Sequence, residues 1–190
     1  VLAVCMFAGS GTWDIEEAVS TAAASGGAAA AAAALMSPAP PLRATVAGGD
    51  HKIAEEGRLV TGNKEHRGCA LCTDCSISAP GAYYWEAKLV KQGNRDTMFG
   101  ITLATYDSTE PLRRQGSWAL RVDNNNCTFW SNGESCGSND HKADRGDQGT
   151  MFGVAMIVES GGASRLYFFR NRRHVAIQGA ETRVGGAGPF

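Results

Sequence analysis

Three of the six cysteines lie close together, and thiolate sulfur is a ligand for zinc and for iron–sulfur clusters. Cys69, Cys72 and Cys75 form a C-x2-C-x2-C run, whereas Cys127 and Cys136 follow much later without a second C-x2-C pair. In a strand, Cys69 and Cys75 would point to one face and Cys72 to the other, so the three sulfurs would not converge. We therefore expect buried or half-buried free thiols, no metal site and a reducing, intracellular environment, most simply the cytoplasm. A Cys-based metal-binding protein is the alternative.

The sequence contains no arrangement typical of an enzyme active site. It lacks a Gly-x-Ser-x-Gly nucleophile elbow, a phosphate-binding loop and a dinucleotide fingerprint, and its four histidines are scattered. His141 lies among Asp140, Asp144 and Asp147, but charges on a loop rich in Gly, Ser and Asn are typical of a solvated surface. The sequence therefore predicts a non-enzymatic protein with no catalytic residue and no cofactor.

Three segments carry residue types that are enriched at binding interfaces. Residues 105–116 (TYDSTEPLRRQG) combine an aromatic ring with arginines, residues 130–147 form a long polar segment that begins with a tryptophan, and residues 170–174 (RNRRH) are rich in arginine. Tyrosine, tryptophan and arginine dominate interface hot spots, and arginine binds carboxylates in a bidentate manner. Loops on a rigid scaffold can present such residues to a partner protein or peptide. The candidate partner-binding residues are Tyr106, Arg113, Arg114, Trp130, Arg170, Arg172 and Arg173.

Composition argues against a nucleic-acid or membrane partner. The 190 residues carry 18 basic and 19 acidic side chains, which does not give the basic surface that phosphate backbones require. The apolar run at residues 1–8 (VLAVCMFA) is far shorter than the roughly 20 residues of a membrane span, and no basic residue precedes it. Because the chain begins without Met, we expect it to be part of a longer protein.

The first 45 residues differ in kind from the rest. Residues 12–19 (TWDIEEAV) could form a short helix, since Thr12 is a suitable N-cap. Residues 22–34 are nearly all Ala and Gly, and the prolines at residues 38–41 then disfavour helix. We predict a low-complexity linker over residues 1–45, disordered or partly helical, with a helix packed on the domain as the alternative.

Residues 46–190 have the pattern of an all-β domain. In residues 83–90 (YYWEAKLV), the odd-numbered positions are mainly large and apolar, which predicts a strand with one buried face. Turn residues separate residues 118–122 from 127–131, and residues 151–158 from 165–169, which predicts two hairpins. Many short strands without helical periodicity favour an antiparallel sandwich. The expected core residues are Tyr83, Trp85, Phe99, Trp118, Phe152 and Phe168.

The order of these segments resembles the SPRY domain family from about residue 67 to residue 190. The similarity rests on Pro80-Gly81 before residues 83–86 (YYWE), on Phe99-Gly100-Ile101, on residues 116–118 (GSW), on residues 145–147 (RGD) before 152–154 (FGV), and on residues 166–171 (LYFFRN). Three departures are Thr150, where the family usually has an apolar residue, Arg172, where the family has glycine after Asn171, and the end of the chain before the family's usual last strand.

The resemblance implies a bent, concanavalin-like β-sandwich that binds partner proteins or short peptides through its loops. SPRY domains often belong to larger intracellular proteins, for example as the substrate-recognising part of a ubiquitin ligase. A carbohydrate-binding lectin is the alternative, because lectins share the concanavalin-like sandwich.

Overall fold

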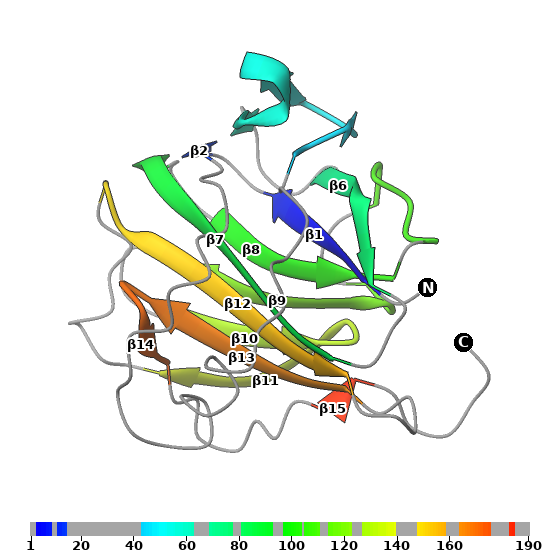
Figure 1. The fold of residues 1–190 in the computed structure, drawn as a ribbon, viewed down its shortest axis with the longest axis vertical. Coiled ribbons are helices and arrows are strands. Elements are labelled where there is room, and N and C mark those ends of the chain that lie inside the picture. Colours follow the sequence, from blue (N-terminus) through cyan, green and yellow to red (C-terminus); the bar gives the residue numbers. More distant parts are fainter. Residues whose placement is uncertain are drawn as a thin grey trace.

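Figure 1 shows the computed structural model of the chain. The structure describes residues 3–8, 11–14, 43–62, 69–77, 81–92, 97–103, 105–110, 114–122, 127–139, 148–158, 164–175 and 183–184. Almost all of these residues lie in or between β-strands, and a single 3-10 turn (Glu55–Gly57) is the helical element among them. Within these ranges, no helix has the length and apolar character needed to cross a membrane.

The first of two antiparallel sheets, sheet A, has seven strands. In order across the sheet they are β11 (Glu134–Asn139), β10 (Cys127–Ser131), β9 (Ser117–Val122), β8 (Thr97–Thr102), β1 (Ala3–Ala8), β6 (Cys69–Ile77) and β3 (Val46–Ala47).

The second sheet, sheet B, has eight strands. Seven follow one another across the sheet as β14 (Arg173–His174), β13 (Ser164–Arg170), β12 (Met151–Val158), β7 (Gly81–Gln92), β2 (Gly11–Asp14), β5 (Leu59–Gly62) and β4 (His51–Ala54). The short strand β15 (Arg183–Val184) pairs with β13 near its start.

The two sheets share one hydrophobic core. The ring of Phe129 in sheet A lies 5.4 Å from the ring of Phe168 in sheet B, measured between centroids. Trp85 and Phe152 belong to the same buried cluster, with exposed fractions of 1% and 0%. The predicted antiparallel β-sandwich is therefore confirmed. Of the expected core residues, five are in this cluster, namely Trp85, Phe99, Trp118, Phe152 and Phe168, and Tyr83 packs against it partly buried.

The alternation predicted for residues 83–90 is confirmed on the core side of β7 and fails at one position on the outer side. Trp85 and Leu89 are fully buried in the core. Glu86, which alternation assigns to the outer face, is only 3% exposed. It is buried because the Tyr84 hydroxyl donates a 2.5 Å hydrogen bond to it and Arg172 pairs with it. The outer face of sheet B is therefore buried around Glu86, although a glutamate at this position predicted an exposed face.

Both predicted hairpins form, and others were missed, among them the hairpin of β10 and β11. β9 pairs with β10 and β12 with β13, all antiparallel. Residues 130–147 were expected to be a loop with Trp130 at its base, but Trp130 lies within β10 and β11 returns beside it. The reason is the turn Asn132-Gly133, whose positive φ angles of 51° and 90° suit a two-residue hairpin. Residues 140–147 lie outside the described residues.

The start of the chain contributes a strand to each sheet. β1 lies between β8 and β6 in sheet A, and β2 lies between β7 and β5 in sheet B. The helix predicted for residues 12–19 is therefore wrong at residues 12–14, which are in β2. Residues 15–42 lie outside the described residues, and the low-complexity linker there stays a prediction.

Candidate functional site

The described part of the connection between β8 and β9, residues 103, 105–110 and 114–116, folds back over the outer face of sheet A. The Leu103 amide donates to the Gly116 carbonyl at 2.8 Å, which closes the base of the connection. Farther along, the Cys69 amide of β6 donates to the Ser108 carbonyl at 2.8 Å. The connection is thus fixed both at its base and to the neighbouring part of the sheet. We call it the β8–β9 connection.

Asp107 organises the first turn of this connection. Its Oδ1 accepts hydrogen bonds from the amide and the hydroxyl of Thr109, both at 2.8 Å. The backbone bond and the side-chain bond both lower the pKa of Asp107, because they stabilise the carboxylate. The Glu110 amide then donates to the Asp107 carbonyl at 3.0 Å. Asp107 is therefore an ionised carboxylate held in a defined turn.

Tyr106 lies against the outer face of sheet A. It packs, together with Trp130, on a small cluster whose members are Cys69, Leu71, Met98 and Ala119. Burial, helped by the charges of Cys69 and Glu110, raises the pKa of Tyr106 to about 12, although a side-chain hydrogen bond with Ser117 opposes the shift. The tyrosine is therefore a neutral phenol near neutral pH, with its ring fixed from below.

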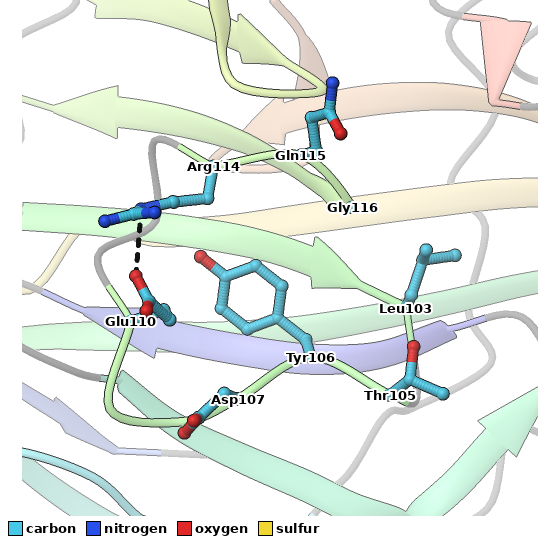
Figure 2. Close-up of a pocket in the computed structure, with 8 residues that line it drawn as sticks. All are labelled: Leu103, Thr105, Tyr106, Asp107, Glu110, Arg114, Gln115 and Gly116. Carbon is cyan, nitrogen blue, oxygen red and sulfur yellow. Dashed lines mark ion pairs between the residues drawn. The ribbon is translucent and has the colours of Figure 1, made fainter.

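The β8–β9 connection lines an open pocket of about 430 Å³. Figure 2 shows the Tyr106 ring in the middle, with the Glu110 and Arg114 side chains on one side and Leu103 on the other. Arg114 Nε lies 2.8 Å from Glu110 Oε2, and these side chains are 63% and 40% exposed. The described lining consists of Leu103, Thr105, Tyr106, Asp107, Glu110, Arg114, Gln115 and Gly116.

The β10–β11 turn supports one end of the pocket. Asn132 Oδ1 accepts a hydrogen bond from the Gly116 amide at 2.8 Å, and the Asn132 amide donates to the Ser117 carbonyl at 2.8 Å. Ser117 is fully buried, and its hydroxyl donates to the Arg114 carbonyl at 2.8 Å. The position of Arg114 thus depends on a turn that lies outside the β8–β9 connection.

The arginines of residues 170–174 lie in the other sheet. Arg170 ends β13 and Arg173 begins β14, so this predicted loop is a hairpin with the two-residue turn Asn171-Arg172. The Arg172 side chain binds Glu86 in a bidentate manner, with Nε 3.1 Å from Oε1 and Nη2 3.1 Å from Oε2. Arg172 is therefore committed to a buried carboxylate, whereas Arg173 is exposed.

The structure brings together only some of the predicted partner-binding residues. Tyr106 and Arg114 line one pocket, and Trp130 packs on the same apolar cluster as Tyr106. Arg113 lies outside the described residues. Sequence reasoning missed Asp107 and Glu110 as pocket residues. Two signals were present in the sequence, namely the Asp-x-Thr turn motif and the spacing of four between Glu110 and Arg114.

Two of the clustered cysteines are buried free thiols on opposite faces of β6. Cys72 belongs to the main core, and Cys69 belongs to the outer cluster beneath Tyr106. Burial, with a smaller effect of Asp107, raises the pKa of the Cys69 thiol to about 12. Cys136 is free and exposed, and the side chain of Cys75 lies outside the described part of the structure. In the part of the chain that the structure describes, no three His, Cys, Asp or Glu side chains are grouped to hold a metal ion.

Comparison with known proteins leaves the family open. No protein-family model matches the chain, and no curated protein matches its sequence.

Proposed function

We propose that this chain is a non-catalytic protein-interaction module that binds a partner protein or short peptide at the pocket of the β8–β9 connection. The observation that carries the proposal is the composition of that pocket. A fixed aromatic ring, an aliphatic wall and an exposed ion pair meet in about 430 Å³ on the outside of a rigid sheet. Binding sites commonly combine apolar and aromatic walls with a few placed polar groups.

The energetics favour this pocket over the arginine-rich hairpin. Tyr106 is already immobilised by packing and by Ser117, so binding would cost little side-chain entropy there. The exposed Glu110–Arg114 pair is weak and can exchange partners. Arg172, in contrast, would leave the buried carboxylate of Glu86 unpaired if it turned to a ligand.

The resemblance to SPRY domains points to the same kind of function. A module of this kind would select the partner for a larger intracellular protein, such as a ubiquitin ligase, whose other domains do the work. The departure at Arg172 lies in the β13–β14 turn of sheet B and not in the β8–β9 connection.

Selection from a displayed library of random peptides tests the proposal. Enriched peptides should bind the parent protein, and Tyr106→Ala should weaken them by about tenfold or more, as for interface hot spots. Arg173→Ala is the matched control, since it removes an exposed arginine from the other sheet and should leave binding unchanged. Failure to enrich any peptide whose binding depends on Tyr106 would refute the proposal.

A carbohydrate ligand is the second candidate, because Tyr106 stands beside the carboxylates of Asp107 and Glu110 in the way that sugar-binding sites combine an aromatic platform with acids. Glycan-array binding that depends on calcium and on Tyr106 would favour it. An array without Tyr106-dependent signal would reject it.

A further inference from the structure

Among the described lining residues, the pocket of the β8–β9 connection carries more negative than positive charge. Among its described lining residues, Asp107 and Glu110 each contribute a carboxylate, whereas Arg114 is the one cation. A cation is therefore favoured over an anion beside the Tyr106 ring.

Both carboxylates can accept further hydrogen bonds. Asp107 uses Oδ1 for its two bonds from Thr109, and among the described residues its Oδ2 accepts none. Glu110 Oε2 faces Arg114 in an exposed pair, which contributes little net free energy and can be shared with a second cation. Figure 2 shows the Glu110 carboxylate beside the Tyr106 ring, next to Arg114, and the Asp107 side chain below the ring, on the turn that leads to Glu110.

The ring itself suits a planar cation. A cation over an aromatic face is attracted by the ring quadrupole, and guanidinium stacks more readily than ammonium because it is planar and weakly hydrated. Tyr106 is held by the cluster beneath it and by Ser117, so its ring is positioned before a ligand arrives. Leu103 supplies an apolar surface on the opposite side for an aliphatic stem.

We propose that this pocket is a recognition site for an arginine side chain of the bound partner. The guanidinium lies over the Tyr106 ring and donates to the carboxylates of Asp107 and Glu110, while its methylene stem packs on Leu103. This inference rests on the proposed function and names the ligand group that the pocket selects.

Titration of the full chain with single amino-acid derivatives, followed by amide chemical shifts, tests the site without a known partner. N-acetyl-arginine amide should shift residues 105–110 and 114–116 and bind about threefold tighter than the lysine derivative. The neutral isostere N-acetyl-citrulline amide and the glutamate derivative should bind about tenfold more weakly than the arginine derivative. Equal binding of citrulline, tighter binding of glutamate or no shift in these residues overturns the inference.

Charge variants of the ion pair provide the matched controls. Glu110→Gln should weaken arginine binding about threefold, and Arg114→Gln should strengthen it or leave it unchanged, because the two changes alter the pocket charge in opposite directions. The opposite order contradicts the inference.

The peptide selection separates this inference from the proposed function. Peptides that depend on Tyr106 but share no arginine would overturn the inference and leave the proposed function standing. If no Tyr106-dependent peptide is enriched, the proposed function fails, and the arginine titration still decides whether the pocket binds the side chain.

Discussion

At the scale of single residues, Arg172 adopts a backbone conformation that normally favours glycine. Its φ is 62°, which costs a residue with a side chain about 1–2 kcal/mol. The compensation is its bidentate pair with Glu86, a carboxylate that is only 3% exposed. The Tyr84 ring lies over Gly153, where a Cβ would collide with it, and this leaves Tyr84 placed to donate to the same carboxylate. The arginine is therefore tolerated because of a partner 86 positions away in the sequence.

Arg172→Gly should destabilise the protein although it relieves the backbone. We expect a loss of about 2 kcal/mol or more in the free energy of unfolding, since a buried carboxylate loses its cation. Denaturant titration measures this loss, and the double variant Arg172→Gly/Glu86→Gln should recover at least half of it. Arg173→Ala, the exposed neighbour, should change stability by less than about 0.5 kcal/mol. An Arg172→Gly protein as stable as the parent would contradict the assigned role of the pair.

The raised pKa of Cys69 predicts that the free energy of unfolding decreases in alkaline solution. The unfolded thiol has an ordinary pKa of 9.0, whereas the folded one is raised to about 12, so only the unfolded state releases this proton between those values. The free energy of unfolding should therefore decrease by about 1 kcal/mol per pH unit from pH 9 upward on account of Cys69, and should not vary below it. In Cys69→Ala, the free energy of unfolding, measured by urea titration, should decrease less steeply with pH above pH 9. The same slope in both proteins would contradict this role of Cys69.

Residue types alone were enough to predict Tyr106 and Arg114 as candidate binding residues. They were not enough to separate Arg114 from Arg172, because both are arginines in short connections. The difference lies in contacts between distant segments, in which Arg114 pairs with exposed Glu110 and Arg172 with buried Glu86.

At the scale of elements, β1 was not predicted because its sequence resembles a terminal apolar run. Residues 3–8 (AVCMFA) show no alternation of polar and apolar side chains, and a short continuous apolar run does not by itself indicate a strand. The sequence of residues 3–8 alone does not show that this strand lies between β8 and β6.

Met6→Pro tests whether β1 is an interior strand. Met6 pairs with Leu71 on one side and Gly100 on the other, so a proline there removes an amide from the sheet and introduces its ring between two neighbours. We expect a loss of about 3 kcal/mol or more, measured by thermal or denaturant unfolding. Ala29→Pro, in the predicted linker, is the control and should be nearly neutral. Equal tolerance of both prolines would show that β1 is dispensable.

The Asn132-Gly133 turn should affect both stability and binding. Asn132→Ala removes the acceptor for the Gly116 amide and places alanine at a φ of 51°, so we expect a loss of about 1–2 kcal/mol. It should also weaken the peptides selected in the display experiment, because Gly116 lines the pocket. Isothermal titration of one selected peptide measures this effect, with the exposed Ser135→Ala as control. If Asn132→Ala bound the selected peptide as tightly as the parent protein does, the turn would not support the binding site.

At the scale of the whole molecule, the fold class could be predicted from the alternation of apolar residues and from the turn residues. The order of the strands in each sheet could not. Trp85 and Phe152 were assigned to one interior from their patterns, and the shared cluster confirms this. Which strands lie side by side depends on pairing between distant segments, as in the placement of β1 between β8 and β6. The β8–β9 connection could be predicted as a loop, but its pocket depends on contacts from β6 and from the β10–β11 turn.

The central claim is that the β8–β9 connection binds the partner, and amide chemical-shift mapping with a selected peptide tests it most directly. Our account predicts that the largest shifts fall in residues 103–116 and in the turn at Asn132-Gly133, with little change at Arg173. Shifts confined to the β13–β14 hairpin, with the β8–β9 connection unaffected, would contradict it.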